Sequence, residues 1–477
     1  MKKILFVTSE AHPLIKTGGL ADVCGSLPKA LAELSQDIKL IIPNYQALKT
    51  SESVRFLCSL RVDNRNINIL ETRMPDSHVT VLLVDYPAYF NYPGNPYVDE
   101  QGEPWTNNAE RFGLFCRIAV EVAMNRGHLD WKPDVVHCND WQTGLVPALL
   151  SLEHDRPNTV FTIHNMAYQG LFPGSAAAEL NLPGKLWHPA GLEFHEMLSF
   201  IKGGLVYADH ITTVSPTYAL EIQTAEFGYG LEGLLNHRKE FLGGIINGID
   251  LDQWNPETDP YIAQTYTAAT LAKKQLNKSE VQRKFALPVN GSVPLFGLIG
   301  RLVEQKGIDL IVECLPEMVA LELQFVLLGS GDKVFEKQLQ KLADLYPEKI
   351  AIRLGYDESL AHLIEAGVDS FLMPSRFEPC GLNQMYSQRY GTIPIVRKTG
   401  GLADTVVDTL PETLAQHTAS GIVFNEADSG SLLEAIKRTM ILYSLPDAWK
   451  KMQINAMNKD FSWQNSAEQY LVLYENL

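Results

Sequence analysis

The sequence contains few cysteines and no long apolar run, and these two absences exclude several classes of protein. Its six cysteines form no Cys-x-x-Cys pair and no zinc-binding spacing. Free thiols in a reducing compartment are therefore expected. The apolar residues 4–7 are too few for a signal peptide, and no run approaches the length of a membrane span. We therefore expect a cytoplasmic protein that has no membrane partner.

Positive charge is also scarce. The chain has 40 Lys and Arg residues against 56 Asp and Glu residues, which gives a net charge of −16 at pH 7. A protein that binds nucleic acid needs a broad basic surface, so no nucleic-acid partner is expected. Gly329-x-Gly331 is only half of a dinucleotide signature, and neither a P-loop nor a Ser-His-Asp motif is recognisable. An anionic ligand would need a local cluster of cations.

Short apolar runs separated by polar or glycine-rich segments recur along the whole chain. They lie at residues 4–7, 38–42, 79–84, 135–137, 160–163 and 211–214, and again at 295–299, 325–328, 350–354, 371–373, 393–396 and 422–424. Amphipathic segments such as 110–126 and 431–443 lie between many of these runs. Apolar strands that alternate with helices are typical of parallel sheets covered on both faces. The sequence therefore predicts two doubly wound α/β domains of Rossmann type.

Length also indicates two domains, because 477 residues exceed what one ordinary core accommodates. Turn signals cluster at residues 243–256 and mark the boundary. We expect a first domain at 1–245, a second at 246–460 with a helical lead-in at 259–285, and a final helical segment at 461–477.

Polar residues follow many predicted strands, at the sheet edge where ligands bind. Two such edges facing each other would form a cleft between the domains.

One heptapeptide, Lys-Thr-Gly-Gly-Leu-Ala-Asp, occurs twice, at residues 16–22 and 398–404. Each copy follows an apolar run and begins a helix-like segment. Paired glycines at a helix start leave backbone N–H groups uncovered, and the helix dipole favours an anion there. The two copies could therefore face one anionic ligand from opposite halves of the chain. The alternative is two unrelated turns that use glycine for positive φ.

Three charged residues follow predicted strands of the second half. Arg301 and Lys306 come directly after residues 295–299, and two cations at a strand end suit a diphosphate. A surface pair with Glu304 is the alternative. Glu378 follows residues 371–373, where it could accept hydrogen bonds from sugar hydroxyls or satisfy free N–H groups at a helix start.

Other candidates are weaker when taken singly. His164, with Asn165 beside it, follows a predicted strand and could bond a hydroxyl or a leaving-group oxygen, although a lone histidine is more often structural. His137 lies next to Cys138 and near Asp140, but no further ligands stand at metal-binding spacing, so no metal is expected. Tyr356 could stack on a nucleobase or simply pack at the sheet edge.

Taken together, these motifs closely resemble the bacterial glycogen synthases and the plant starch synthases of glycosyltransferase family five. The matching blocks lie at residues 16–22, 134–141, 162–165, 301–307, 374–381 and 390–404 and follow the family's order. The resemblance implies the GT-B architecture: two Rossmann-like domains with a cleft between them, and a last helix that returns to the first domain. The implied reaction transfers glucose from ADP-glucose to the 4-hydroxyl at the non-reducing end of an α-1,4-glucan such as glycogen. It retains the anomeric configuration and needs no metal or other cofactor.

The resemblance also implies roles for individual residues. Lys16, in a loop with Gly18, Gly19 and Asp22, would reach the bound ADP-glucose, and Asp22 would orient Lys16 or serve the helix start. The second heptapeptide copy follows residues 393–396 almost directly, so its glycine turn is expected to support the site or border the diphosphate rather than mirror Lys16. Arg301 and Lys306 would neutralise the diphosphate, while Glu378 and His164 would hold the transferred glucose. Among the remaining substrate-binding candidates, Asp140 and Asn165 would meet glucose or the acceptor, and Tyr356 would pack on adenine. The amides near Gly381, Leu382 and Asn383 would hold the distal phosphate. Asn247, Gly355 and Cys380 complete the substrate-binding set.

Two positions test the match to the family. Asn383 stands where the family usually has threonine, which affects a side-chain contact but leaves the backbone amide. Tyr386 replaces the second glutamate of the wider E-x7-E pattern, as is usual for synthases.

Competing hypotheses are a transferase that uses UDP-glucose or a small acceptor, and a non-catalytic glucan-binding scaffold. A phosphorylase is disfavoured because the chain is short and no pyridoxal-lysine segment is recognisable. The sequence carries no signal of oligomeric state.

Overall fold

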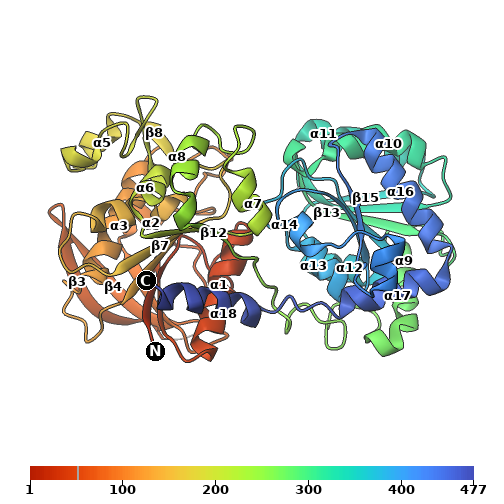
Figure 1. The fold of residues 1–477 in the computed structure, drawn as a ribbon, viewed down its shortest axis with the longest axis horizontal. Helices are drawn as coiled ribbons and strands as arrows, with labels where there is room; N and C mark the ends of the chain where they lie inside the picture. Colours follow the sequence, from red (N-terminus) through yellow and green to blue (C-terminus); the bar gives the residue numbers. More distant parts are fainter. Residues whose placement is uncertain (51–52) are drawn as a thin grey trace. The chain divides into compact units, whose positions relative to one another are not determined.

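The computed structural model describes residues 1–50 and 53–477 and divides them into two compact units. The first unit contains Met1–Gly248 together with Trp463–Leu477, and the second contains Ile249–Ser462. The expected boundaries, after residues 245 and 460, lie within three residues of these divisions. Both chain ends belong to the first unit (Figure 1).

The described residues of the first unit form a nine-stranded sheet in the order β12-β11-β7-β6-β1-β2-β5-β4-β3. Its strands are β1 (Lys3–Val7), β2 (Asp37–Pro43), β3 (Arg55–Val62), β4 (Arg65–Arg73), β5 (Thr80–Asp85), β6 (Val135–Asn139), β7 (Asn158–Ile163), β11 (His210–Thr213) and β12 (Leu242–Gly244). From β12 to β5 every neighbouring pair is parallel. The six apolar runs of the first half correspond to β1, β2, β5, β6, β7 and β11.

One edge of this sheet adds antiparallel strands to the expected parallel arrangement. β3 and β4 pair antiparallel with each other, and β4 pairs antiparallel with β5. Asp63 and Asn64 join the two strands with φ angles of 46° and 61°, which suit the tight turn of a hairpin. Side chains of β4 alternate between buried and exposed positions. Such a strand is half polar, so the search for continuous apolar runs missed it.

Helices of the first unit lie between the strands, and the last of them returns from the end of the chain. They are α1 (Gly19–Glu33), α2 (Pro87–Phe90), α3 (Asn108–Ala123), α4 (Leu145–Leu150), α5 (Ala176–Glu179), α6 (Phe200–Tyr207), α7 (Pro216–Glu221), α8 (Glu232–His237) and α18 (Trp463–Glu475). A small antiparallel sheet contains β8 (Leu171–Pro173), β10 (Met197–Ser199) and β9 (Glu193–Phe194). Helix α18 packs against α1 (Figure 1).

Two tyrosines of α18 are buried beside the central strand β6. Tyr470 and Tyr474 are four residues apart, so they share one face of the helix. The Tyr474 hydroxyl lies 2.6 Å from Nδ1 of His137, and Nε2 of His137 lies 2.6 Å from Oγ1 of Thr162. Burial lowers the pKa of His137 to about 3, so the imidazole is neutral. His137 therefore connects the terminal helix to the sheet.

The second unit contains a six-stranded parallel sheet in the order β15-β14-β13-β16-β17-β18. Its strands are β13 (Leu295–Leu302), β14 (Gln324–Gly331), β15 (Ile350–Leu354), β16 (Ser370–Met373), β17 (Ile393–Arg397) and β18 (Ile422–Phe424). Its helices are α9 (Lys274–Lys284), α10 (Ile308–Met318), α11 (Lys333–Leu345), α12 (Glu358–Gly367), α13 (Asn383–Arg389), α14 (Gly400–Thr405), α15 (Pro411–Ala415), α16 (Ser429–Tyr443) and α17 (Pro446–Met457). All six apolar runs of the second half form strands. The expected lead-in at 259–285 is helical only from the 3₁₀ segment Ala268–Lys273 onward.

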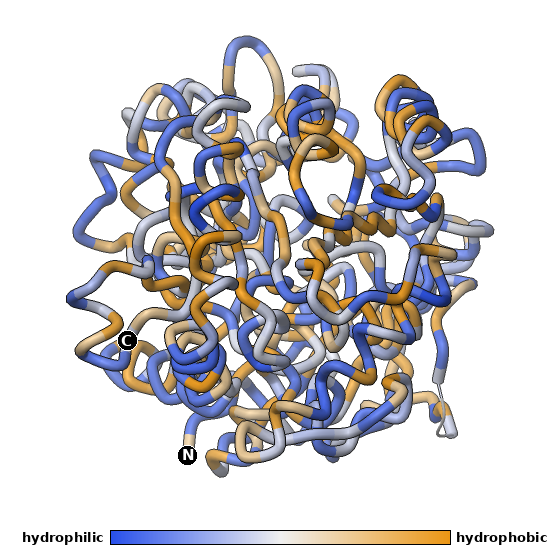
Figure 2. The backbone as a smooth tube through the Cα atoms, turned by 90° about the vertical axis from the view of Figure 1, so that its right-hand side faces the viewer, coloured by the Kyte–Doolittle hydropathy of each residue, from blue (hydrophilic) through white to orange (hydrophobic). Residues whose placement is uncertain are grey.

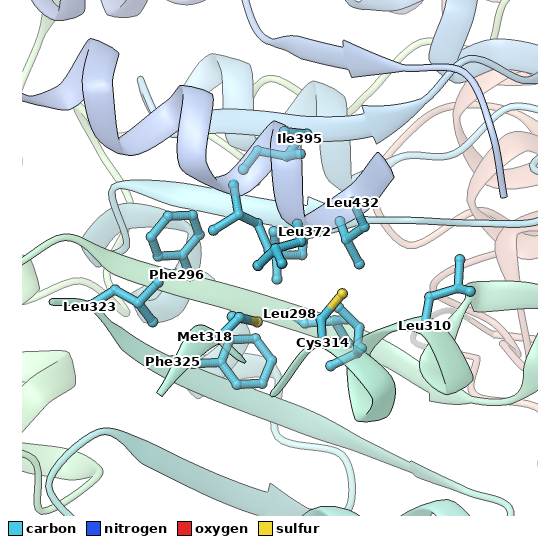
Figure 3. Packing of buried hydrophobic residues seen from close by; sticks show 14 of the residues in the cluster. Phe296, Leu298, Leu310, Cys314, Met318, Leu323, Phe325, Leu372, Ile395 and Leu432 are labelled. Atoms are coloured by element: carbon cyan, nitrogen blue, oxygen red, sulfur yellow. The ribbon is translucent and has the colours of Figure 1, made fainter. Parts of the chain in front are cut away.

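Successive residues of the central strands enter two different cores. Phe296 and Leu298 of β13 belong to a core formed with α10, α11, α16 and α17, which Figure 3 shows in part. Leu295 of the same strand belongs to a second core formed with α9, α12 and α14. Strand β14 divides in the same way, with Leu327 on one side and Val326 on the other. The sheet is therefore buried on both faces, as its continuous apolar strands predict.

Polar and apolar stretches alternate along the described chain, without one long apolar block (Figure 2). None of the helices found in residues 1–50 and 53–477 is long and apolar enough to cross a membrane.

Candidate active site

In the second unit, Lys306 and Glu378 form an ion pair although they lie 72 residues apart in the sequence. The Lys306 ammonium donates to Oε2 of Glu378 at 2.5 Å, and the Ser375 hydroxyl donates to the same oxygen at 3.0 Å. Lys306 ends the 3₁₀ turn Glu304–Lys306 (η5) after β13, and Glu378 follows β16. Neighbouring parallel strands thus bring both residues to one edge of the sheet.

Close backbone packing fixes this pair. Gly307, directly after Lys306, has a φ of 68°, and a Cβ built there would lie 2.1 Å from the carbonyl oxygen of Pro374. The N–H of Arg376 donates to the carbonyl of Gln305 at 2.9 Å. The η5 turn therefore lies directly on the segment that carries Glu378, and a side chain at position 307 would push the two apart.

The second copy of the heptapeptide supports the Glu378 turn from behind. The Gly401 N–H donates to the carbonyl oxygens of Glu378 and Pro379 at 3.2 and 3.1 Å. A Cβ built on Gly401 would lie 2.2 Å from the Cys380 carbonyl, and one built on Gly400 would lie 2.0 Å from the Glu378 carbonyl. The paired glycines are therefore required by close contact between two backbone segments.

The predicted phosphate-binding residues lie in the turn after Glu378. Cys380 is buried, Gly381 has a φ of 73°, and Leu382 precedes α13, whose first residue is Asn383. The Asn383 carboxamide donates to the carbonyl of Ile299 in β13 at 2.8 Å. Its side chain thus bonds to the sheet, while the backbone amide remains part of the predicted set.

The other predicted residues of this unit lie at neighbouring strand ends. Arg301 is an exposed residue of β13, opposite Ser330 of β14. Gly355 follows β15 with a φ of 120°, and its N–H donates to the Gly329 carbonyl at 3.0 Å. Tyr356 comes next, with 78% of its surface exposed. Arg301, Lys306, Glu378 and Tyr356 therefore share the carboxyl edge of one parallel sheet.

In the first unit, the first heptapeptide copy forms the turn that begins α1. The Lys16 ammonium lies 2.6 Å from Oδ1 of Asp22, so Asp22 does contact Lys16. The N–H groups of Thr17 and Gly18 donate to Oε2 of Glu10 at 2.5 and 3.3 Å. A carboxylate of the chain itself thus accepts two N–H groups of the turn that begins with Lys16 and continues through Gly18 and Gly19. An external anion was one of the two alternatives that the sequence left open for this turn.

Asp140 lies at the end of β6 in a strained backbone conformation, with φ 60° and ψ 180°. Burial raises the pKa of its carboxyl to about 8. Hydrogen bonds from the N–H groups of Trp141, His164 and Asn165 lower this pKa, but the effect of burial is larger. Its Oδ1 atom is buried and has no hydrogen-bond partner within residues 1–50 and 53–477. The strand ends of β6 and β7 thus bring together Asp140, His164 and Asn165.

The His164 imidazole is neutral and oriented by a neighbouring amide. Burial lowers the pKa of His164 to about 3. Nε2 of His164 lies 3.1 Å from Oδ1 of Asn139, and the Asn139 amide nitrogen donates to the Val7 carbonyl. Because Asn139 thereby presents its oxygen, Nε2 carries the proton and Nδ1 is the acceptor nitrogen. Asn247, after β12, is buried, and its Oδ1 has no partner among the described residues.

Sequence reasoning missed several residues that shape these clusters. Glu10 and Ser375 follow strands and carry only the signal of a polar residue near a strand end, and Tyr97 carries no local motif. The repeated heptapeptide was the sequence feature that pointed to the contacts of Gly400 and Gly401 with the Glu378 turn. No group of three or more His, Cys, Asp or Glu side chains able to hold a metal occurs in the part of the chain that the structure describes.

Comparison with known proteins identifies relatives of both units. Residues 3–237 match the starch synthase catalytic domain family, and residues 280–455 match glycosyl transferases group 1. Glycogen synthase 1 of Methylococcus capsulatus is 55% identical over 99% of this chain and 96% of its own length. Glycogen synthase of Cellvibrio japonicus is 52% identical over the full length of both chains.

Solved structures extend the match to the fold. The catalytic domain of starch synthase IV from Arabidopsis thaliana, solved with ADP and acarbose, is 33% identical, with a TM-score of 0.90 over 100% of this chain and 99% of that one. Sucrose-phosphate synthase from Thermosynechococcus elongatus, at 17% identity and a TM-score of 0.61, shares the fold. With its two Rossmann-like domains of GT-B type, this chain belongs to the family of bacterial glycogen synthases and plant starch synthases.

Proposed function

We propose that this protein transfers glucose from ADP-glucose to the non-reducing 4-hydroxyl of an α-1,4-glucan, with retention of configuration, in the cytoplasm. The observation that carries the proposal is the Lys306–Glu378 pair, held at a sheet edge with Arg301 in a chain about half identical to glycogen synthases. Six free cysteines in the described chain are compatible with a reducing compartment.

The charges of the second unit suit the departure of a diphosphate. An ammonium group has three N–H donors, so Lys306 can keep its bond to Glu378 and still meet a phosphate oxygen. Arg301 adds a planar fork of donors. Charge grows on the diphosphate as the bond to glucose breaks, and cations fixed beforehand stabilise that transition state. The C1–O bond to ADP breaks, the 4-hydroxyl oxygen bonds to C1, and its proton passes to the departing phosphate.

The remaining residues take the roles of binding and orientation. Glu378 accepts hydrogen bonds from hydroxyls of the transferred glucose through oxygen lone pairs that Lys306 and Ser375 leave available. Backbone amides of Gly381, Leu382 and Asn383 bind the distal phosphate, with Cys380 buried beneath them. Tyr356 packs on adenine beside Gly355. In the first unit, Lys16 approaches the donor with Gly18 and Gly19, and Asp140, His164, Asn165 and Asn247 bind glucose or the acceptor.

The decisive experiment is transfer of radiolabelled glucose from ADP-glucose to glycogen by the purified full-length chain. We expect label in the glucan and an equal amount of ADP. UDP-glucose, tested in parallel, separates the alternative donor, and maltose tests the small acceptor. Glycogen binding without turnover of either nucleotide sugar would instead identify a glucan-binding scaffold.

A further inference from the structure

We propose that Glu10 is a positioning residue for the Lys16 loop, and that its carboxylate holds this loop in the conformation that presents Lys16 to the donor. The inference rests on the proposed function, because Lys16 acts on ADP-glucose only under that function. It goes further by assigning a role to Glu10, Tyr97 and the segment behind them.

The Glu10 carboxylate is bonded on both oxygens. Oε2 accepts the N–H groups of Thr17 and Gly18 at 2.5 and 3.3 Å. Oε1 accepts the Tyr97 hydroxyl at 2.5 Å, and that hydroxyl lies 2.7 Å from Oγ of Ser9. Glu10 is 2% exposed. A buried carboxylate with three donors is fixed in one position, and the two N–H groups are fixed with it.

The backbone of Glu10 is anchored as firmly as its side chain. Its N–H donates to Oγ1 of Thr8 at 3.2 Å, and the Thr8 hydroxyl donates to the Glu10 carbonyl at 2.8 Å. Thr8 directly follows β1, and its N–H donates to the Ile41 carbonyl of β2 at 3.2 Å. Glu10 therefore connects the central strands of the sheet to the loop that carries Lys16.

Tyr97 is held just as rigidly on the other side. Its carbonyl accepts the Asn108 amide at 3.0 Å and the Trp105 N–H at 3.1 Å. The preceding Pro96 carbonyl accepts Nη1 of Arg111 at 2.8 Å, and Arg111 is 1% exposed. A buried arginine on α3 thus fixes the segment that supplies Tyr97, and Tyr97 fixes Glu10.

Lys16 is exposed, whereas Glu10, which holds its loop, is buried. Its side chain is 41% exposed and contacts Asp22. The turn N–H groups of Thr17 and Gly18 already have their anion, so the loop needs no bound phosphate to keep its shape. A Glu10 that served stability alone would affect folding but not the rate of the folded enzyme. A positioning role predicts a loss of rate.

The test uses the full-length chain with Glu10→Gln and Glu10→Ala. Gln keeps the size of the side chain and one acceptor, while Ala removes both oxygens. Glu71→Gln is the matched control, because Glu71 pairs with exposed Arg55 on the edge hairpin of the same unit. We expect kcat for transfer from ADP-glucose to glycogen to fall at least tenfold in both Glu10 variants, with KM changed less, and to stay unchanged in the control.

Chemical rescue separates positioning from general damage. Formate is a small carboxylate that can occupy the space left in Glu10→Ala and accept the Thr17 and Gly18 N–H groups, whereas formamide lacks the charge. We expect formate, and not formamide, to restore part of the lost kcat. Equal effects of the two additives would overturn the proposal, as would specific activities equal to that of the control in both variants.

Hydrogen exchange gives a readout that does not depend on turnover. Peptides that span residues 16–20 should exchange faster in both Glu10 variants than in the wild type, while peptides of β6 and β7 stay unchanged. Unaltered exchange at residues 16–20 overturns the role of Glu10 even if the wild type proves inactive with ADP-glucose. Wild-type inactivity with faster exchange would refute the proposed function and leave the support of the loop intact.

Discussion

The ammonium of Lys306 lies 2.5 Å from a carboxylate oxygen of Glu378, and a serine hydroxyl shares that oxygen. The side chain of Lys306 is 26% exposed and that of Glu378 is 7% exposed, so the pair has one buried end and one end open to solvent. A partly buried pair of this kind can gain a ligand on its exposed side without breaking.

Removing either charge should abolish most of the transfer activity. We expect Lys306→Met and Glu378→Gln each to lower the turnover of ADP-glucose about 100-fold or more, because each removes a group that stabilises or orients the reacting centre. The fold-loss of turnover in the double variant should be smaller than the product of the fold-losses in the two single variants, since the residues act as a unit. Lys437→Met is the control: Lys437 pairs with Glu434 on the exposed face of α16 and should be neutral. Near-wild-type rates in either site variant would refute the assignment.

The glycine pair of the second heptapeptide should be essential for activity. In Gly401→Ala the new methyl group would lie 2.2 Å from the Cys380 carbonyl, so the Glu378 turn must move. Because a displacement of about 1 Å at a catalytic group can cost 100-fold in rate, we expect kcat to fall by about that factor. Gly291→Ala is a suitable control, because its methyl group would meet one side-chain atom at 3.5 Å. Steady-state kinetics of both variants, checked for folding by circular dichroism, decide the matter.

His137 should make the first unit sensitive to acid. Its pKa is about 3 in the folded chain and near 6.5 when unfolded, so between these values only the unfolded state takes the proton. Stability therefore falls as the pH drops from about 6.5 toward 3, by up to about 1.4 kcal/mol per pH unit. His137→Gln should be less stable than the wild type at pH 7 but lose less stability between pH 7 and 5.

Urea midpoints at the two pH values measure this effect. His154→Gln, at an exposed position of the same unit, should retain the wild-type dependence on pH. Burial lowers the pKa of His164 in the same sense, so part of the acid sensitivity will persist in His137→Gln. An unchanged pH dependence in His137→Gln would contradict the prediction.

The last helix should contribute to stability through its buried face. Tyr474 is fully buried and its hydroxyl meets His137, whereas Val472 on the same helix is 58% exposed. We expect Tyr474→Ala to cost about 3–5 kcal/mol, as large-to-small changes in a core do. Val472→Ala should change the free energy of unfolding by less than about 0.5 kcal/mol. Comparable unfolding midpoints for the two variants would show that α18 is not needed for the core.

Most strands of the fold could be located from the sequence because they are buried on both faces. All twelve apolar runs form strands, and the alternation of side chains in β13 and β14 explains why each run is continuous. The hairpin β3–β4 escaped notice because one face of such an edge pair is exposed, which breaks the apolar run. Helix α18 carries its aromatic face in the sequence, but its partner, His137, lies 337 residues away.

The sequence by itself determined which chemical groups stand at strand ends, since Arg301, Lys306, Glu378, His164 and Asp140 each follow an apolar run. Only the tertiary structure decided what those groups contact. It paired Lys306 with Glu378, directed the Asn383 side chain to Ile299, and filled the first glycine turn with the Glu10 carboxylate. It also gave the two identical heptapeptides different contacts: Lys16 of the first contacts Asp22, and the second packs its glycines against the Glu378 turn. The physical reason is that local sequence sets the backbone conformation of a turn, whereas the groups that surround the turn come from distant segments.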